Sequence, residues 1–151
     1  MKREDTLLVV IDVQGKLARI VHDSERVLNN IALLARGVRL MGGEVVWLEQ
    51  NPERLGPTVP EVAAELDGLT PIPKMTFDAC DTGAFLQALE RTGSKNVLLT
   101  GIETHICVYQ TAIGLRDRGY AVQTVADAVS SRTEANKNVA LQRMQAEGIR
   151  L

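Results

Sequence analysis

The chain has 151 residues, of which 45% are hydrophobic and 24% charged, and these values are typical of one globular domain with a substantial core. A net charge of -2 and an aromatic content of 3% provide neither the positive potential nor the stacking surfaces of nucleic-acid-binding proteins. No apolar run approaches the ~20 residues that span a bilayer. We therefore expect no nucleic-acid partner and no membrane insertion.

The cysteine content points to a reducing compartment. The only two cysteines, Cys80 and Cys107, lie far apart and form no Cys-x-x-Cys pattern. With two histidines in the whole chain, no structural zinc site can be assembled by the usual ligand spacings. The sequence therefore predicts a cytoplasmic protein whose cysteines are either buried packing or working thiols.

The first half of the chain begins with a strand that is apolar throughout, at residues 7–11, as expected for a strand covered on both faces. Residues 24–41 place apolar side chains three and four positions apart, which predicts an amphipathic helix. Two glycines end this helix, and residues 44–48 form the next predicted strand. Residues 51–60 contain three prolines and are predicted to be a loop, either a ligand lid or a spacer.

The second half of the chain continues this alternation of strands and helices. We expect a short helix at 61–66, an extended segment at 70–75, helices at 83–91, 107–118 and 133–147, strands at 97–100 and 121–125, and the opening of another strand at 149–151. Such alternation favours βαβ units. We therefore predict a single three-layer α/β/α domain with a mostly parallel, doubly wound, Rossmann-like sheet of strand order 3-2-1-4-5 and a stub of a sixth strand.

Three polar residues stand at the ends of apolar segments: Asp12, Lys74 and Cys107. The predicted strand order brings the carboxyl end of the first strand next to that of the 97–100 strand, so Asp12 and Cys107 should share a crevice. A helix N-terminus favours the thiolate form of a cysteine. A neighbouring carboxylate can act as its base, and a lysine can stabilise either charge. The pattern indicates a nucleophilic cysteine.

Each of these residues also has a structural interpretation. A lone cysteine near a helix start often only packs in the core, Asp12 could cap the turn after its strand, and Lys74 could be a solvated side chain. Cys80, just before a predicted helix cap, is interpreted as structural. His105 could be a base or a pocket residue, and Asp127 could belong to the crevice or to a turn. Residues and spacing alone leave these alternatives open.

Four segments resemble the isochorismatase-like cysteine hydrolases, and in particular the isochorismatase domain-containing branch. They are residues 10–14 (VIDVQ), 49–52 (EQNP), 73–74 (PK) and 101–108 (GIETHICV), in the family's order over nearly the whole chain. The resemblance implies a hydrolase domain over 1–151 and a catalytic triad of Asp12, Lys74 and Cys107. The family usually continues with a further strand and a closing helix, which we expect to be missing after Leu151.

The resemblance also implies a mechanism. The Cys107 thiolate attacks a carbonyl or nitrile-like carbon to form a covalent adduct, Asp12 carries the proton, and water releases the acid. The family has a non-proline cis peptide in the preceding turn, which corresponds to Ile102-Glu103 and would direct backbone N–H groups of Glu103 and Cys107 to an oxyanion hole. Residues 49–52 lack the histidine of the nicotinamidase metal cluster, so no metal or other cofactor is expected. Isochorismate cleavage does not need the cysteine, so Cys107 points away from that substrate.

The sequence thus predicts a cofactor-free cysteine hydrolase acting on a small amide or related C–N substrate through a covalent acyl-enzyme. Besides the triad, the predicted substrate pocket comprises Gln14, Leu17, Asn51, His105 and Ile106. A homo-oligomer is expected, with a neighbouring subunit close to the pocket. The alternatives are a catalytically silent binding or scaffold protein of the same fold, and a peroxide-sensing thiol.

Overall fold

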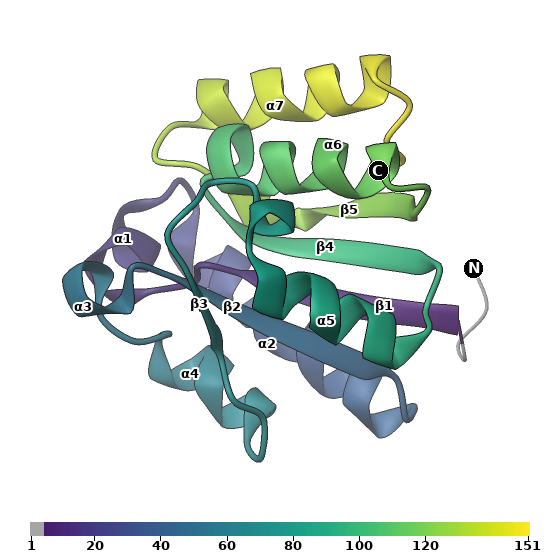
Figure 1. Ribbon diagram of the computed structural model, residues 1–151. Helices are drawn as coiled ribbons and strands as arrows, with labels where there is room; N and C mark the ends of the chain where they lie inside the picture. The colour runs from purple at the N-terminus through teal and green to yellow at the C-terminus, as the bar shows by residue number, and fades with distance from the viewer. Residues whose placement is uncertain (1–4) are drawn as a thin grey trace.

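The computed structural model describes residues 5–151, which form a parallel five-stranded sheet in the order β3-β2-β1-β4-β5 (Figure 1). The strands are β1 (Thr6–Ile11), β2 (Glu44–Gln50), β3 (Ile72–Lys74), β4 (Asn96–Ile102) and β5 (Ala121–Ser130). The helices are α1 (Gly15–Ile20), α2 (Ser24–Leu40), α3 (Pro52–Leu55), α4 (Pro60–Ala63), α5 (Gly83–Thr92), α6 (Tyr109–Asp117) and α7 (Glu134–Ala146). Short helical turns lie at Ala64–Leu66, Ala79–Asp81 and Thr104–Val108. The predicted fold class and strand order are confirmed.

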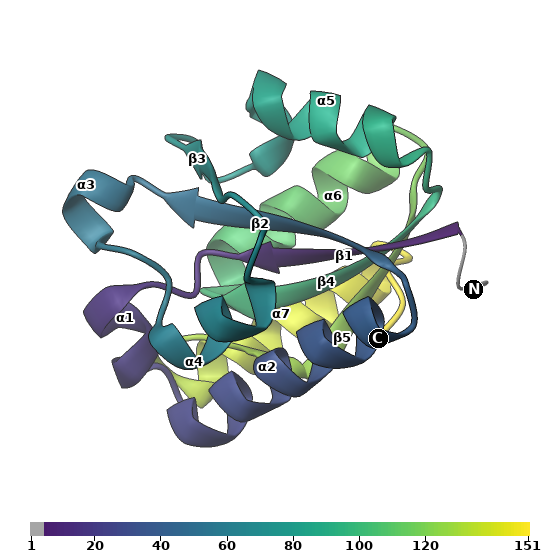
Figure 2. The same cartoon turned by 90° about the horizontal axis from the view of Figure 1, so that it is seen from below.

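Helices cover both faces of the sheet, with α2 and α4 on one side and α5 and α6 on the other (Figure 2). The central strand β1 shows how the sequence produces this arrangement, because its five apolar side chains are all fully buried. Leu8 and Val10 pack in the same cluster as Ile31 of α2, whereas Leu7 and Val9 pack in the cluster of α5 and α6. An uninterrupted apolar strand is what burial on two faces requires.

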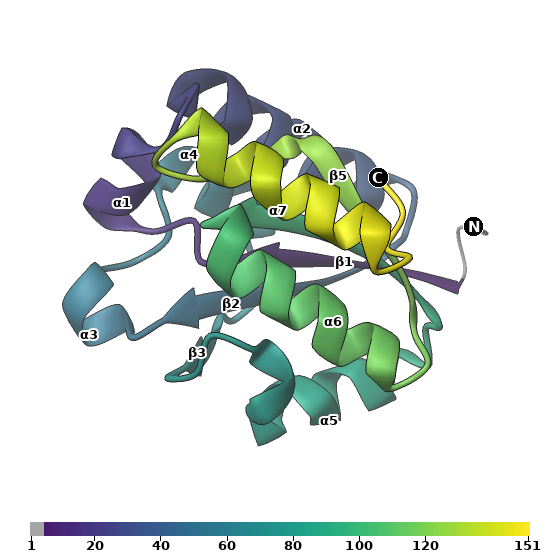
Figure 3. The ribbon, with the colours of Figure 1, turned by 90° about the horizontal axis from the view of Figure 1, so that it is seen from above.

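The last helix lies beside α6 and leads the chain back to the sheet edge (Figure 3). There Arg150 forms an isolated parallel bridge to Gln123 of β5. The Thr124 N–H donates to the Arg150 carbonyl at 2.9 Å, and the Arg150 N–H donates to the Val122 carbonyl at 3.3 Å. This bridge is the predicted stub of a sixth strand. Within residues 5–151, no helix combines the length and apolar character needed to cross a membrane.

Some elements differ from the sequence prediction. Strand β5 continues to Ser130 rather than ending at 125, because its register against β4 shifts: Leu99 faces Thr124, but Gly101 faces Val129. Asp127 lies in the extra length and interrupts the apolar pattern that would have revealed the strand. Helix α1 was not predicted, and the expected loop at 51–60 contains the helical turn α3.

Candidate active site

The carboxyl ends of β1 and β4 lie side by side and form the floor of the site. Ile11 pairs with Gly101 across these strands, and a Cβ at Gly101 would lie 2.2 Å from the Ile11 carbonyl oxygen. Gly101 also has φ 141°, a backbone conformation that L side chains rarely adopt, so glycine is required there. Asp12 follows β1 directly with φ 57°, and Cys107 lies in the turn after β4. The predicted convergence of strand ends is therefore present.

Lys74, the last residue of β3, reaches this floor as a fully buried ammonium group. Its Nζ donates to Asp12 Oδ2 at 2.7 Å, to Gln50 Oε1 at 2.7 Å and to the Thr76 carbonyl at 3.1 Å. These bonds use all three ammonium protons, as a charge removed from water requires. Asp12 is also buried, and its second oxygen, Oδ1, has no hydrogen-bond partner among the described residues.

A cavity of about 290 Å³ opens above Asp12 and Cys107. Its other lining residues are Leu17, Gln50, Leu55, Phe77, Glu103, Ile106 and Arg132. Since a water molecule occupies ~30 Å³ in the liquid, the cavity has the volume of about ten waters. It therefore fits a small organic molecule, held between apolar side chains and the polar groups of Asp12, Gln50 and Arg132.

The thiol of Cys107 is protonated in the resting protein. Burial raises its pKa to about 12, the negative charge of Asp12 raises it further, and Lys74 opposes the rise. Burial also raises the pKa of Asp12, against the opposing effect of Lys74. Burial and the neighbouring carboxylate thus act against the thiolate expected from the helix position, and Cys107 lies in a π turn at Thr104–Val108 and not in the first turn of α6. Attack by this thiol requires a base, and Asp12 is the carboxylate beside it.

Cys80 shows that a raised pKa alone does not mark the site. Burial, followed by the charge of Asp78, raises the Cys80 pKa to about 12 as well. Both cysteines are free and buried. Only Cys107 lines the cavity with Asp12. Cys80 thus provides a matched internal control for experiments on Cys107.

Among the predicted pocket residues, Leu17 and Ile106 lie on the cavity wall, whereas Gln14 does not. Gln14 is fully buried, and its Nε2 donates to the carbonyls of Gln50 at 3.1 Å and Gly56 at 2.7 Å. Its Oε1 accepts from the Gln50 N–H at 2.7 Å. Gln14 therefore ties α3 to the end of β2, and these bonds hold its side chain away from the cavity wall.

Asn51 and His105 also lie off the cavity wall. The Asn51 N–H donates to the Lys74 carbonyl at 2.9 Å, and its left-handed backbone, with φ 37°, turns the chain into α3. His105 Nδ1 lies 2.9 Å from the Ser131 hydroxyl oxygen. His105 is thus bonded to a neighbouring segment through its side chain and Asn51 through its backbone, and neither lines this cavity.

The turn between β4 and Cys107 has a trans backbone. No peptide bond within residues 5–151 is cis, so the cis bond expected at Ile102-Glu103 is not found. The chain reverses instead through Gly101 and a left-handed Glu103, with φ 56°. Ile102 is fully buried in the core cluster that faces α2. The left-handed residue therefore turns the chain toward Cys107 without the cis bond that was expected to direct N–H groups to an oxyanion hole.

The sequence prediction missed several lining residues. Gln50 had been noted only as part of the EQNP segment, yet its amide binds Lys74 and lines the cavity. Arg132 follows the unexpected extension of β5, and a longer predicted strand would have placed it at the site. Leu55 is the last residue of α3, within the 51–60 segment for which a ligand lid was one interpretation, and Phe77 lies in an irregular segment whose local pattern indicates no pocket.

Glu49 lies in the segment that was compared with the nicotinamidase metal cluster, but its carboxylate is hydrogen-bonded to Thr58. Its Oε1 accepts hydrogen bonds from the Thr58 N–H at 2.7 Å and from the Thr58 hydroxyl at 2.8 Å. Across residues 5–151, no group of three or more His, Cys, Asp or Glu side chains is placed to hold a metal ion. Glu49 instead fixes the loop that carries Leu55 to the cavity.

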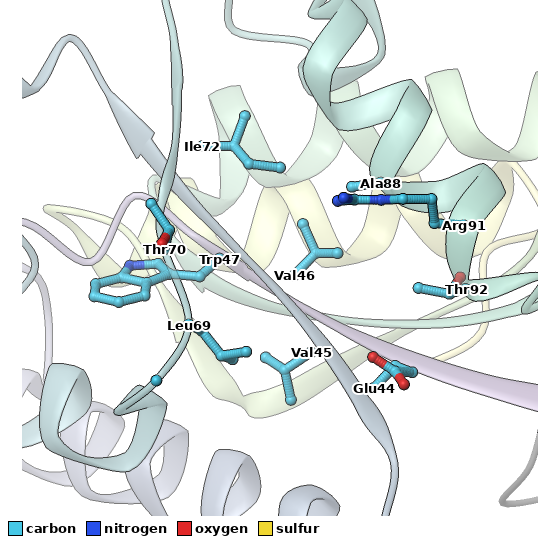
Figure 4. Close-up of a pocket in the computed structure, with 11 residues that line it drawn as sticks. Glu44, Val45, Val46, Trp47, Leu69, Thr70, Ile72, Ala88, Arg91 and Thr92 are labelled. Atoms are coloured by element: carbon cyan, nitrogen blue, oxygen red, sulfur yellow. The ribbon is translucent and has the colours of Figure 1, made fainter.

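A second, larger hollow of about 340 Å³ lies along β2, beyond the end of the short strand β3 (Figure 4). Val45 and Trp47 point to the side of Leu69, whereas Val46 points toward Ala88. Its charged side chains, Glu44 and Arg91, are exposed, and no cysteine lines it. The smaller cavity is therefore the candidate active site.

The chain belongs to the isochorismatase family, because the Isochorismatase domain matches residues 6–151. Isochorismatase domain-containing protein 2 of Bos taurus is 38% identical over 144 residues, covering 95% of this chain and 68% of that protein. The family relationship and the hydrolase fold predicted from the sequence are thus confirmed.

Two solved structures have closely similar folds. The MAR1 ribonuclease of Caenorhabditis elegans is 33% identical, with a TM-score of 0.93 over 100% of this chain and 78% of that one. The YcaC gene product of Escherichia coli, described as an octameric hydrolase of unknown specificity, is 25% identical, with a TM-score of 0.93 over 100% of this chain and 76% of that one. Because one of these proteins is named a ribonuclease, the predicted exclusion of nucleic acid rests on charge and composition alone.

Proposed function

We propose that the protein is a cysteine hydrolase that cleaves a small amide or related C–N bond through a covalent acyl-enzyme. One observation carries the proposal: Lys74 binds one oxygen of Asp12, while the other oxygen is buried without a partner in the cavity that Cys107 lines. A buried carboxylate oxygen that Lys74 leaves free is suited to accept a proton from a neighbouring thiol.

In the first half of the reaction, Asp12 accepts the Sγ proton of Cys107 as the sulfur attacks the substrate carbonyl carbon. The S–C bond forms, and the carbonyl π electrons move to the oxygen. When the oxyanion collapses, the C–N bond breaks, and the Asp12 carboxylic acid gives its proton to the leaving nitrogen. Lys74 remains protonated and keeps Asp12 oriented through its bond to Gln50.

In the second half, water attacks the thioester and Asp12 accepts one of its protons. Collapse of this tetrahedral adduct releases the carboxylic acid product, and the sulfur recovers its proton from Asp12. The backbone N–H groups of Glu103 and Cys107 are the proposed oxyanion donors. Two donors of this kind stabilise the charge that develops on the carbonyl oxygen.

The pH dependence of alkylation tests the role of Asp12. We would alkylate Cys80→Ala protein with iodoacetamide from pH 5 to pH 11 and quantify Cys107 modification by mass spectrometry. If Asp12 is the base, the rate levels off once its carboxyl is ionised, well below the Cys107 pKa of about 12. In Asp12→Asn protein the plateau disappears and the rate rises about tenfold per pH unit, because only free thiolate then reacts. A tenfold slope through neutral pH in the parent protein would contradict the proposal.

A substrate panel separates the hydrolase from its alternatives. Small amides, N-carbamoyl compounds and nitriles should include at least one substrate whose turnover Cys107→Ser abolishes. Tight binding without turnover would favour a scaffold or binding protein, and reversible peroxide oxidation of Cys107 without hydrolysis would favour a redox thiol. Hydrolysis of RNA that survives in Cys107→Ser would contradict both the reaction class and the expected absence of a nucleic-acid partner.

We also propose that the protein forms a homo-oligomer and works in the cytoplasm. The octameric state described for the Escherichia coli protein supports the first point. The exposed apolar side chains of Met75 and Phe77, next to the cavity, offer a surface that a second copy can cover. Light scattering gives the assembly size directly, and a monomer at micromolar concentration would overturn this part of the proposal.

A further inference from the structure

Arg132 lies two residues beyond the end of β5 and lines the same cavity as Cys107. Its Nε donates to Glu103 Oε1 at 3.2 Å. Within residues 5–151, its two terminal amino groups, Nη1 and Nη2, donate no hydrogen bond, and the side chain is 55% exposed. One edge of the guanidinium group is therefore anchored and the other is free to bind a ligand.

The anchor of Arg132 is a constrained residue. Glu103 is buried, with only 6% of its surface exposed, and its backbone is left-handed at φ 56°. It sits in the turn that connects β4 to Cys107. The position of the guanidinium group is thus coupled to the turn that presents the nucleophile, in contrast to a freely moving surface arginine.

Arg132 is the available cation of the cavity. Its charge is paired with Glu103 through Nε alone, which leaves the terminal amino groups for a ligand. Among residues 5–151, the other cation close to Asp12 is Lys74, which uses its three protons on Asp12, Gln50 and Thr76. The remaining wall is largely apolar, from Leu17 to Phe77. An anionic group on a bound molecule therefore has one place where charged donors are free to receive it.

We propose that Arg132 binds a carboxylate of the substrate, so that the hydrolase acts on small amides, or related C–N compounds, that also carry a carboxylate. This inference rests on the proposed function and narrows its substrate class. The planar guanidinium group can donate two parallel hydrogen bonds to a carboxylate, which gives both affinity and orientation. Because Arg132 and Cys107 line the same cavity of about 290 Å³, a small molecule whose carboxylate binds Arg132 can place its amide group at Cys107.

Paired alkylating reagents test the inference without a known substrate. In Cys80→Ala protein, we would compare Cys107 alkylation by iodoacetate with that by iodoacetamide, and by 3-iodopropionate with that by 3-iodopropionamide. The anion-to-amide rate ratio should fall about tenfold in Arg132→Gln for at least one pair, because a charge-assisted bond is lost. Arg132→Lys should show an intermediate ratio, since it keeps the charge but not the planar geometry.

The control is Arg91→Gln, which removes one positive charge at the distant hollow along β2. Its ratios should equal those of the parent protein. Ratios unchanged in Arg132→Gln for both pairs would overturn the inference, as would an equal fall in Arg91→Gln. The Arg132→Lys protein also covers the case in which Arg132→Gln fails to fold after Glu103 loses its partner.

Equilibrium binding keeps this test separate from the test of the nucleophile. In Cys107→Ser protein, succinamate should bind about tenfold more tightly than neutral succinamide, and Arg132→Gln should remove the difference. Failure of Cys107 to react with any of the reagents would count against the proposed function. Equal affinities for the two ligands, including undetectable binding of both, would count against the role of Arg132 whatever the thiol does.

Discussion

The candidate active site and the hollow along β2 differ in a way that their volumes do not show. The hollow along β2 is the larger, at about 340 Å³ against about 290 Å³, but its charged residues face solvent. The smaller one contains the buried ion pair of Lys74 and Asp12. Burying two charges costs several kcal/mol per ion before their attraction offsets the loss of water. In this protein the ion pair lies at the carboxyl ends of the strands, where Lys74 of β3 reaches across β2 to Asp12 after β1.

The largest expected difference between the hollows is in catalysis. Cys107→Ala should lower amide turnover by at least ~10³-fold, because loss of a nucleophile removes the covalent route. Thr92→Ala in the hollow along β2 should leave kcat/KM unchanged within about twofold, and Cys80→Ala should do the same. Steady-state kinetics on the best substrate of the panel measures all three. A comparable loss of turnover in Thr92→Ala would place the reaction in the hollow along β2 and contradict the assignment of the active site.

The second difference is in stability. Lys74→Met should lower the free energy of unfolding by about 3–5 kcal/mol, because it leaves Asp12 buried without its counter-ion. Arg91→Met, which removes an exposed cation, should change it by less than about 0.5 kcal/mol. Urea denaturation of both variants checks this pair of values, and equal effects would remove the distinction between the hollows.

A third test is the pH dependence of the unfolding free energy that Lys74→Met loses. Burial raises the pKa of Asp12 in the folded protein and Lys74 opposes the rise, so the pKa climbs further without Lys74. A carboxyl group whose folded pKa lies above its unfolded pKa loses stability as the pH rises through the folded value. Urea midpoints should therefore show a smaller penalty at pH 5 than at pH 8. A penalty that grows toward acidic pH would mean that Asp12 is not the group left unpaired.

A smaller effect is expected at Gln14. Gln14→Leu should lower the unfolding free energy by about 1–3 kcal/mol, because it leaves the Gln50 backbone and the Gly56 carbonyl without partners. Since Gln14 does not line the cavity, KM should change less than stability does. Thermal unfolding and kinetics on the same preparation separate the two. A changed KM with unchanged unfolding would restore Gln14 to the pocket.

The smallest effect is expected at Trp47, which lines the hollow along β2. The Trp47 Nε1–H donates to Thr58 Oγ1 at 2.7 Å, and Thr58 in turn donates to Glu49. Trp47→Phe should cost about 1 kcal/mol for the lost hydrogen bond. Activity should fall by no more than a few fold, because the backbone bond from Thr58 to Glu49 remains. Hydrogen exchange at residues 55–60 would show whether the loop loosens as this chain of bonds predicts.

The strand order and the meeting of Asp12, Lys74 and Cys107 could be predicted from the sequence. Apolar runs identify β1 and β4 because both strands are buried on two faces. Polar residues that follow these strands then lie together at the carboxyl end of the sheet. Lys74 was a candidate from its place at the end of an apolar segment, but its position beside the other two depended on the family resemblance, since its strand has only three residues. The protonation state of Cys107 could not be predicted, because it depends on how completely the folded chain excludes water.

The wall of the cavity was predicted less well, and the reason is physical. Gln14 and Asn51 lie close in sequence to site residues, but the side chain of Gln14 and the backbone of Asn51 are hydrogen-bonded to neighbouring segments. Leu55 reaches the cavity from the single turn of α3 and Phe77 from an irregular segment, and neither is identified by a periodic pattern. Arg132 required knowledge of the register shift in β5. Proximity in sequence therefore predicted the catalytic floor better than it predicted the wall.

The register shift in β5 has a consequence for how this site can be altered. Between the pairs Leu99–Thr124 and Gly101–Val129, β4 advances by two residues and β5 by five. The surplus of three residues is contained in 125–128, and pairing resumes at Val129 and Ser130, just before Arg132. A deletion or insertion between 125 and 128 that moves the point where pairing resumes should shift that arginine along the cavity without replacing any residue of the catalytic floor. Chain length in this bulge is thus a means of retuning the distance between charge and nucleophile, and with it the length of the molecule that fits between them.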